Sequence, residues 1–428
     1  MNNITEDLDL IGAQLLDPKS GISKIGNIYI RGGKIHHKQP NQIHASKILD
    51  LKDHVILPGL LDLRVHNRVP GATKSENIES LSKAAARGGI SAILTMPDTN
   101  PYSDNPATIR YIQDRVNQTS KIKVHLSGCL TIGSKGENLA PLGSLKDAGV
   151  VAVTDCPNTP KDNQILTNAL KYAKMFDLVV LDFPQDQYLT KKSHAHESAL
   201  SLKMGLAGNP RMAEEIAVQR AILLSKHLNV SIHISSISSA GSVTLIQQAK
   251  QQGVQVTTDV SAHHLLLNED QISNYNVCAK TNPPLRQETD RLALIDGIKT
   301  GVIDACNSSH EPNAEHLTNV EFDKAPSGTI GLETAVLAFI EAVNENDPFP
   351  LLIEKMCYKP HSILNLDVPS LAEKSNANLV AIHKSKKWVY DSNLGMSLSC
   401  NSPLDGFQFQ NKITLTASMG DISYKSLN

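Results

Sequence analysis

The feature that most constrains the fold of this chain is a regular alternation of short apolar segments with longer helix-like segments. Eight short segments rich in β-branched residues lie between residues 55 and 306. They are 55–62, 90–96, 123–128, 150–154, 178–182, 230–234, 254–260 and 302–306. Mostly apolar strands separated by helix-length connections are typical of a parallel sheet with both faces covered by helices.

The connecting segments have the periodicity of helices. In residues 76–87, apolar side chains recur at helical spacing, and Gly88-Gly89 supplies a stop signal. Residues 211–227 and 242–252 follow the same pattern. Eight alternations over about 260 residues predict a (β/α)8 barrel of the TIM type. A doubly wound open sheet is the alternative, but no GxGxxG motif follows the first strand.

The two ends of the chain differ from its middle. Residues 1–54 and 374–428 contain short alternating segments and turns. These patterns predict strands that pair into one small β-sandwich. We therefore expect two domains, a sandwich made of residues 1–56 with 370–428 and a barrel made of residues 57–369.

Charge and cysteine usage exclude several classes of protein. The chain has 41 basic and 43 acidic side chains, a formal charge of −2, which gives no reason to expect binding to nucleic acid or an anionic membrane. No apolar run approaches a membrane span, and the first residues lack the basic and apolar regions of a secretory signal. The six cysteines are scattered without a CxxC pair, so a reducing cytoplasm is expected.

Motifs at the predicted strand ends point to a family. Residues 58–71 read PGLLDLRVHNRVPG, and further motifs are MPDTNP at 96–101, AGNPRMAE at 207–214, HHL at 263–265, KTNPPLR at 280–286 and GLET at 331–334. In this order they resemble the amidohydrolase superfamily, and within it the long bacterial dihydroorotases, which read PG-x-x-D-x-H-x-H-x-R-x-PG at the first motif. The resemblance runs through nearly the whole chain.

This resemblance implies a binuclear zinc site whose bound hydroxide attacks or releases a cyclic amide. Of the six ligand positions, only His66 keeps the family's residue. Where the family has S/T-D-D-G, this chain reads TDCP, so a cysteine stands in place of the second carboxylate. The family's H-x-x-D is FPQD here, and its HIAHVS is HISSIS. The family's TDHAPH is SSHEPN here. The replaced positions are Arg64, Cys156, Phe183, Ser236 and Ser309. An arginine has no lone pair to give a metal, so the positions are degenerate.

The substrate pocket that the resemblance implies is only partly retained. Arg68 matches the arginine that holds the substrate carboxylate, and Asn282 matches a second pocket residue. Asp98 replaces an asparagine and would repel a carboxylate, while Asn313 replaces a histidine.

Other polar residues could contribute to a site. A replacement metal site could be assembled from strand-end residues, namely Asp155, Cys156, Asp182, His310 and Glu311. We expect such convergence to be fortuitous, because side chains alternate in direction along a strand end. We expect His263-His264 to be architectural and Cys306 to be a buried core thiol.

The lost ligands favour a chain that is not an enzyme, with no catalytic residue, cofactor or metal. Arg64 could then fill the metal void with its own charge, paired with Asp62 or Asp155. The pattern resembles non-catalytic dihydroorotase-like chains that assemble with the catalytic chain of aspartate carbamoyltransferase in bacterial pyrimidine biosynthesis, as a hetero-dodecamer of six plus six. That resemblance implies a structural subunit needed for assembly.

Two alternatives remain open. The first is an active zinc-dependent cyclic-amide hydrolase, a dihydroorotase with a rebuilt or mononuclear metal site. The second is a metal-free ligand sensor that uses Arg68 and Asn282. Zinc is expected only under the first alternative.

Overall fold

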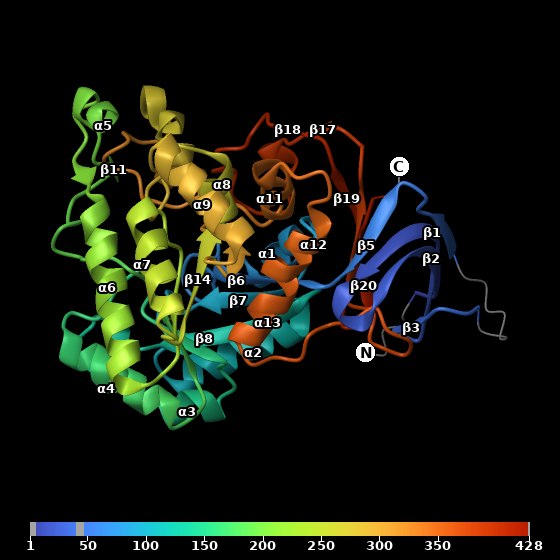
Figure 1. Cartoon of the computed structure of the whole chain (residues 1–428), viewed down its shortest axis with the longest axis horizontal. Helices are drawn as coiled ribbons and strands as arrows, with labels where there is room; N and C mark the ends of the chain where they lie inside the picture. The colour runs from blue at the N-terminus through green and yellow to red at the C-terminus, as the bar shows by residue number, and fades with distance from the viewer. Residues whose placement is uncertain (1–5, 40–46, 427–428) are drawn as a thin grey trace.

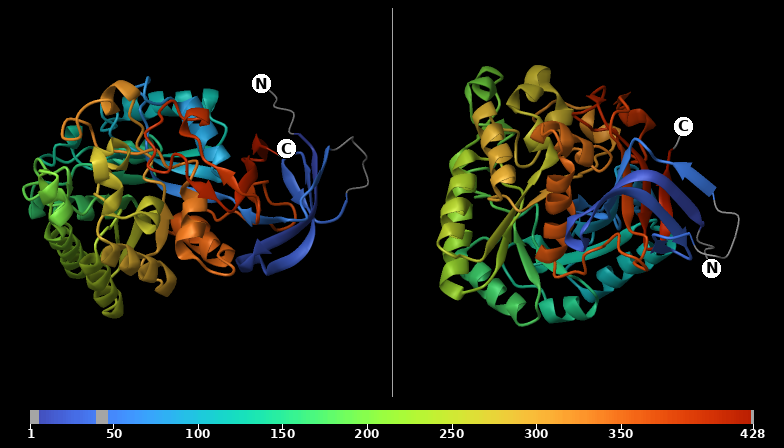
Figure 2. Two further views of the ribbon diagram at one scale, coloured as in Figure 1. Left: turned by 90° about the horizontal axis from the view of Figure 1, so that it is seen from above. Right: turned by 45° about the vertical axis from the view of Figure 1, so that its right-hand side comes forward.

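A computed structural model describes residues 6–39 and 47–426 of the chain. An eight-stranded parallel barrel lies beside a mixed sheet that both ends of the chain build (Figure 1, Figure 2). The predicted fold class is therefore confirmed. Within the described ranges, every helix is too short or too polar to pass through a bilayer. The first five residues, which belong to the segment tested for a secretory signal, lie outside the described residues.

The barrel strands follow one another in chain order, each parallel to the next. They are β6 (Leu60–His66), β7 (Ile90–Met96), β8 (Lys123–Cys129), β9 (Ala152–Thr154), β10 (Val179–Asp182), β13 (Ile232–Ile234), β14 (Val256–Ser261) and β15 (Ala305–Asn307). The segment after β15 returns to the first strand, where the backbone N–H of His66 donates to the carbonyl of His310 at 2.8 Å. Strand ends that are distant in sequence therefore meet at one rim.

Helices surround these strands (Figure 2). The main ones are α1 (Ile78–Arg87), α2 (Pro106–Thr119), α3 (Leu142–Asp147), α4 (Asn163–Lys174), α6 (Arg211–Leu228), α7 (Ala240–Gln251), α9 (Glu288–Thr300) and α11 (Ala335–Val343). Shorter elements are α5 (Ala199–Lys203), α8 (Ala262–Leu266), α10 (Glu315–Thr318), α12 (Phe349–Ile353), α13 (Lys359–Ile363), β11 (Ala195–His196), β12 (Gly208–Asn209), β17 (Trp388–Val389) and β18 (Gln408–Phe409). The predicted helices at 76–87, 211–227 and 242–252 correspond to α1, α6 and α7.

The predicted first strand, 55–62, is divided into two. Its first part is β5 (His54–Pro58), which belongs to the terminal sheet, and its second part begins β6. Gly59 separates them at a point of close packing, since a Cβ there would lie 2.3 Å from Ser91 Oγ. An apolar run that crosses from one sheet into another cannot be distinguished from one long strand by its periodicity.

The terminal sheet joins segments from opposite ends of the chain. Its order is β20-β19-β16-β5-β1-β2-β3, with β4 also paired to β1. The strands are β1 (Leu8–Asp17), β2 (Ile22–Arg31), β3 (Lys34–His36), β4 (Lys47–Asp50), β16 (Leu379–His383), β19 (Lys412–Ser418) and β20 (Asp421–Lys425). The two ends meet where β5 runs antiparallel to β16. The domain boundaries at 56/57 and 369/370 stay predictions.

The terminal sheet packs against the first helix and second strand of the barrel. Thr416 Oγ1 donates to the carbonyl of Ala86 at 2.7 Å, and Ser418 Oγ donates to that of Ser91 at 2.7 Å. Ile413 belongs to the same apolar core as the barrel helices. The sheet is thus fixed to the flank of the barrel (Figure 1).

Candidate metal and substrate site

All six predicted ligand positions are buried at the carboxyl ends of barrel strands. Arg64 and His66 lie in β6, while the others follow strands β9, β10, β13 and β15; they are Cys156, Phe183, Ser236 and Ser309. Reacting groups of TIM barrels lie at this end. The predicted alternation of strands and helices therefore placed these positions at the rim where TIM barrels carry their active sites.

The side chain of Arg64 is buried between Phe183 and the backbone of Asn282. It is fully buried, and its guanidinium carbon lies 4.8 Å from the centroid of the Phe183 ring. Its Nη2 donates to the carbonyl of Asn282 at 3.0 Å, whereas Nε and Nη1 have no partner among the described residues. The backbone N–H of Arg64 donates to Asp62 Oδ1 at 2.9 Å, but among the described residues its guanidinium forms no ion pair with Asp62 or Asp155. Arg64 thus lies inside the barrel as expected, but the expected pairing of its charge is not observed, and its role in place of a metal stays a prediction.

Among the four other replaced positions, the side chain of Cys156 interacts with His66, whereas Ser236 and Ser309 bond to other residues. Cys156 and Phe183 belong to an apolar cluster inside the barrel. The backbone N–H of Ser236 donates to the carboxylate of Asp259, and its hydroxyl accepts from Asn307 Nδ2 at 3.3 Å. The backbone N–H of Ser309 donates to Asn307 Oδ1 at 2.8 Å. With a cation and a phenyl ring at two ligand positions, these residues do not fit a binuclear zinc centre.

A different cluster surrounds His66, the retained position. His66 Nδ1 lies 2.8 Å from Asp98 Oδ2, and His66 Nε2 lies 3.9 Å from Glu311 Oε2. One ligand atom from each of His66, Asp98 and Glu311 can be chosen so that all lie within 4.8 Å of one another. His66 Nε2 is buried and has no hydrogen-bond partner among the described residues. One imidazole and two carboxylates form a donor set suited to a single divalent cation.

Arg68 balances the charge of this cluster. Its Nη1 donates to Asp98 Oδ2 at 3.0 Å, Nη2 lies 3.6 Å from Glu311 Oε1, and Nε donates to the carbonyl of Pro312 at 3.1 Å. The predicted substrate arginine is therefore already paired with carboxylates of the chain itself. A carboxylate ligand would have to compete with Asp98 for it.

Electrostatic interactions hold His66 and Asp98 in their charged forms. Burial by itself would lower the pKa of His66, but the Asp98 and Glu311 carboxylates raise it to about 10. Burial opposes ionisation of Asp98, yet the charges of His66 and Arg68 hold the pKa of that carboxyl below its usual value. A cation bound at His66 would have to displace its proton.

Asn282, the second predicted pocket residue, lines a small polar cavity of about 170 Å³ at the same rim. Thr281 lines the same cavity with a buried hydroxyl that has no partner among the described residues. Asn313 is not among the cavity's lining residues; its Nδ2 donates to the carbonyl of Ser327 at 3.2 Å. The cavity provides amide and hydroxyl groups of the kind that bind a small polar ring.

The predicted replacement cluster forms only in part. Asp155 accepts from Thr131, Asp182 pairs with Arg220, and His310 lies 3.4 Å from Glu76. Of the predicted set, Glu311 and Cys156 lie beside His66, and Asp98 completes the group that could hold an ion. Because His66, Asp98 and Glu311 come from the first, second and eighth strands, their meeting depends on closure of the barrel.

The histidine pair at the end of β14 has a local role. His264 Nδ1 lies 2.7 Å from Ser261 Oγ, and its Nε2 lies 3.2 Å from the carbonyls of Pro283 and Pro284. His263 Nδ1 lies 3.3 Å from Thr329 Oγ1. These contacts accord with the expected architectural role. Cys306 is fully buried, and burial raises the pKa of its thiol, as expected of a core cysteine.

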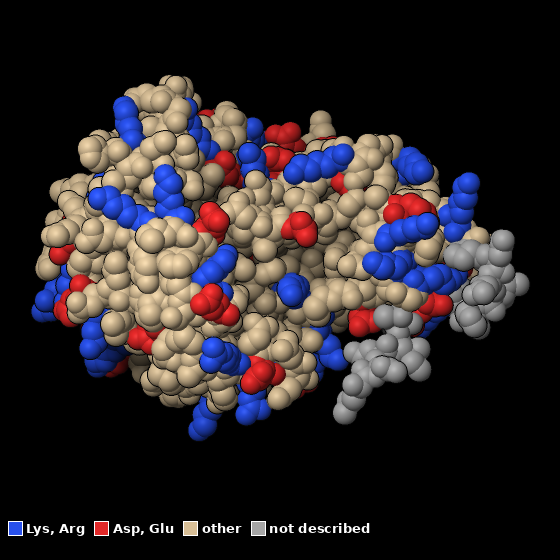
Figure 3. Space-filling view, turned by 90° about the horizontal axis from the view of Figure 1, so that it is seen from below, with Lys and Arg blue, Asp and Glu red and all other residues tan. Residues whose placement is uncertain are grey.

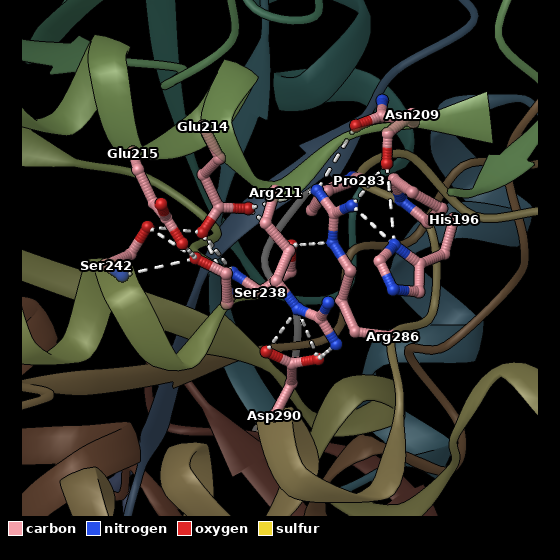
Figure 4. Close-up of polar contacts among 12 residues, drawn as sticks. His196, Asn209, Arg211, Glu214, Glu215, Ser238, Ser242, Pro283, Arg286 and Asp290 are labelled. Carbon is pink, nitrogen blue, oxygen red and sulfur yellow. Dashed lines mark hydrogen bonds and ion pairs between the residues drawn. The ribbon is translucent and has the colours of Figure 1, made fainter. Parts of the chain in front are cut away.

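The AGNPRMAE and KTNPPLR motifs meet in a buried polar network (Figure 4). Arg286 donates to the carbonyl of Asn209 at 2.7 Å and to Ser238 Oγ at 3.0 Å. Glu214 accepts from the backbone N–H groups of Ser238 and Ser239 at 2.8 and 2.9 Å. These family motifs thus hold the loops of the barrel rim together.

Known proteins resemble the chain over almost its full length. Residues 53–242 match the family model described as Dihydro-orotase-like. A dihydroorotase of Acetivibrio thermocellus is 36% identical over 414 residues, covering 96% of this chain and 97% of the relative. One of Pelobacter propionicus is 34% identical over 415 residues, covering 96% and 98%.

Solved structures show the same fold. The L-hydantoinase (dihydropyrimidinase) of Arthrobacter aurescens superposes with a TM-score of 0.83 at 22% identity, covering 98% of this chain and 96% of the other. The dihydropyrimidinase of Brevibacillus agri gives 0.84 at 18% identity, covering 99% and 96%.

These relatives correct the functional prediction. The degenerate positions Arg64, Cys156, Phe183, Ser236 and Ser309 indicated a non-catalytic assembly subunit, but the full-length relatives bear the name of an enzyme, dihydroorotase. The prediction of a non-enzyme is contradicted by that finding, which favours the alternative of an active hydrolase. It failed because it gave most weight to the loss of the family's ligands and expected convergence of replacement residues to be fortuitous, whereas His66 has other ligand-type neighbours. The chain belongs to the dihydroorotase family.

Proposed function

We propose that this chain is a cyclic-amide hydrolase that interconverts dihydroorotate and its ring-opened form, N-carbamoyl-aspartate. The observation that carries the proposal is the convergence of His66, Asp98 and Glu311 at the carboxyl ends of the barrel strands. The names of the relatives supply the substrate class.

The residues of this cluster would hold one divalent cation. His66 offers its unpartnered Nε2, while Asp98 and Glu311 offer carboxylate oxygens. When bound, such a cation would supply a water of lowered pKa (about 7 instead of about 15.7) as the nucleophile at neutral pH.

The chain's own groups have separate tasks in this proposal. Asp98 Oδ2 fixes the imidazole of His66 through Nδ1, so that Nε2 faces Glu311. Glu311 Oε2 is placed to accept a proton and return it to the leaving nitrogen. Arg68 neutralises the two carboxylates, and the cavity lined by Asn282 and Thr281 holds the polar ring.

The test combines metal analysis with turnover. We expect about one divalent ion per purified chain and measurable conversion of dihydroorotate. His66→Ala should lose both the ion and the turnover, because the cluster loses its nitrogen ligand. His125→Ala, in the amino-terminal half of β8, should retain both. A folded wild-type chain with neither metal nor turnover would overturn the proposal.

The association with an aspartate carbamoyltransferase catalytic chain stays a prediction, and an active hydrolase is compatible with it. Mass measurement of a mixture of the two purified chains tests it. Cytoplasmic location is likewise part of the proposal, and it is supported by six cysteines that are all free.

A further inference from the structure

A cavity lies at one end of the terminal sheet. It encloses about 440 Å³ and is bounded by β4, the first residue of β5, the last residue of β16, β19 and Ser426, which follows β20. None of its described lining residues belongs to the cluster around His66 or to the small polar cavity at the barrel rim. Small-ligand sites in proteins range from about 300 to 1,000 Å³, so this cavity is large enough for a small molecule.

The buried polar group that faces this cavity is His54. It is 7% exposed, and neither ring nitrogen has a hydrogen-bond partner among the described residues. A neutral imidazole carries one N–H donor and one acceptor nitrogen, and a protonated imidazole carries two donors. Because a buried donor is normally paired, His54 offers the cavity an N–H that the described part of the chain leaves unused.

A second imidazole lies beside the first. His383 of β16 is the cross-strand partner of His54, and the two ring centroids are 4.6 Å apart. His383 lines the same cavity. Its Nδ1 accepts from the backbone N–H of Ser385 at 3.3 Å, so a neutral His383 carries its proton on Nε2. The two rings thus bring two N–H donors to one end of the sheet.

The charged groups around the two rings are mainly basic. Lys386 lines the cavity, and Lys412 of β19 is the cross-strand partner of His383. These lysines repel a metal cation, and a stable cation site also needs more ligands than two imidazoles supply. The surroundings therefore favour an anion.

Two carboxylates lie near the same end of the sheet. Asp50 lines the cavity, but its side chain is exposed and lies 3.5 Å from Lys52 Nζ. Asp53, which precedes His54 in the chain, raises the pKa of His54. Burial and then the charge of His383 lower that pKa by more, and Lys386 acts in the same direction. The charges that act on His54 thus favour an anion even with both carboxylates present.

We propose that this cavity binds a small phosphorylated anion, either inorganic phosphate or a phosphate monoester, beside His54, His383 and Lys386. A phosphate group presents about three free acceptor oxygens and nearly two negative charges at neutral pH, which matches two N–H donors and a nearby ammonium group. The site is separate from the proposed hydrolase site, and its occupancy does not depend on that function.

Binding should be linked to protonation of His54, because an anion beside the ring stabilises the imidazolium. Without ligand the pKa of His54 is about 4. A bound anion that returns this pKa to its ordinary value of about 6.5 makes binding about tenfold tighter at pH 5.5 than at pH 7.5, with about one proton taken up at the lower pH. Sulfate is the probe for this measurement, since its charge does not change over that range.

Isothermal titration calorimetry of the full chain tests the site. At pH 7 we expect inorganic phosphate or glycerol 3-phosphate to bind with a Kd below about 1 mM. His54→Phe and His383→Phe should each weaken binding at least tenfold. His54→Phe should also abolish the proton uptake that accompanies sulfate binding at pH 5.5, measured in two buffers of different ionisation enthalpy.

His36→Phe, in β3 of the same sheet, is the matched control. His36 lies outside the cavity and pairs with Glu373 at 2.8 Å, so its replacement should change neither affinity nor proton uptake. Circular dichroism confirms that each variant is folded. His54→Gln keeps a polar side chain without a titrating ring, and it should lose the proton uptake even where His54→Phe does not fold.

The two phosphate sources are distinguished by affinity. Tighter binding of glycerol 3-phosphate identifies a monoester as the occupant, and equal affinities identify inorganic phosphate. Absence of binding by both phosphates and by sulfate at about 10 mM, roughly ten times the expected constant, overturns the proposal. So does binding that His54→Phe and His383→Phe leave unchanged, or sulfate binding without proton uptake. Binding of Ni²⁺ that His54→Phe abolishes, with no binding of phosphate, would assign the two rings to a cation instead.

Discussion

At the residue scale, buried charges at the barrel rim depend on a few close partners. Glu214 is 3% exposed and lies 3.7 Å from the Arg286 guanidinium, with Ser242 Oγ donating to it at 2.7 Å. Two backbone N–H groups donate to the same carboxylate. A carboxylate is the only side-chain group of this size that accepts at every position, so a charged acceptor is required here.

Glu214→Gln should therefore destabilise the fold by about 3 kcal/mol, because it leaves a buried guanidinium without its carboxylate and aims an amide donor at other donors. The measurement is urea unfolding followed by circular dichroism. Glu79→Gln is the control: its carboxylate is exposed and pairs with Lys83, so the loss should be small beside that of Glu214→Gln. Equal losses in the two variants would contradict this account.

His54 shows the cost of a buried imidazole in the terminal sheet. Neither ring nitrogen has a partner among the described residues, and the ring lies 4.6 Å from that of His383. Burial, and then the neighbouring His383, lower the pKa of His54 to about 4. In the unfolded chain its pKa is about 6.5. Between pH 6.5 and pH 4, His54 therefore binds a proton more readily in the unfolded chain than in the folded one. The free energy of unfolding should decrease as pH falls through this range, because protonation favours the unfolded state.

Replacing His54 with phenylalanine should remove this dependence. The unfolding free energy of His54→Phe relative to wild type should be constant above pH 7.5 and should rise as pH falls from 6.5 toward 4. Taking the difference between the two chains removes the contributions of all titrating groups that the substitution leaves unchanged. Denaturant unfolding at pH 8, 6.5, 5.5 and 4.5 measures it. A difference that does not vary with pH would show that His54 is not held neutral.

At the scale of elements, close backbone approach decides where helices and strands can end. Gly88, which ends α1, lies against the segment that precedes α11: a Cβ on it would lie 1.9 Å from the carbonyl oxygen of Leu332. Its φ of −79° is open to any residue. Glycine is required here by space and not by backbone conformation.

Gly88→Ala should accordingly cost at least 2 kcal/mol (about the middle of the range for overpacking), since a backbone carbonyl and not a flexible side chain must move. Gly26→Ala in β2 is the matched control, because its Cβ would meet Leu15 at an ordinary 3.4 Å. We expect that variant to lose less than about 1 kcal/mol. Thermal unfolding of both variants measures the difference, and comparable midpoints would contradict the steric argument.

The elements also show how far the sequence could predict the fold and the site. The periodicity and length of the apolar segments predicted all eight barrel strands, because short β-branched segments alternate with helical segments. They did not locate the division at Gly59, which depends on contact with Ser91. Likewise they placed His66, Asp98 and Glu311 at one rim, but not within reach of each other. These three side chains converge because the barrel closes, and closure cannot be predicted from a local sequence pattern.

At the scale of the whole molecule, the surface agrees with the near-neutral composition. Figure 3 shows basic and acidic side chains interspersed over the face that the barrel presents there. The predicted exclusion of nucleic-acid binding rests on that balance and stays a prediction.

The barrel and the terminal sheet form one connected structure. Ile413 of β19 lies in the barrel's apolar core and contacts the Gly88-Gly89 turn region, where a Cβ on Gly89 would approach it to 3.1 Å. The edge of β16 is covered by β19, which is covered in turn by β20. A chain that ends at residue 411 would therefore lose two strands, expose the edge of β16 and uncover α1.

We expect the chain 1–411 to be insoluble or to lack a cooperative unfolding transition, because an exposed apolar edge and an opened core both promote aggregation. The chain 1–426, which keeps every described strand, should unfold with the same midpoint as the full chain. Differential scanning calorimetry with sedimentation velocity distinguishes the two. A soluble 1–411 chain with a sharp transition near the wild-type midpoint would show that the barrel is stable without the C-terminal strands. In that case the terminal sheet would be an attached domain and not part of the barrel's own support.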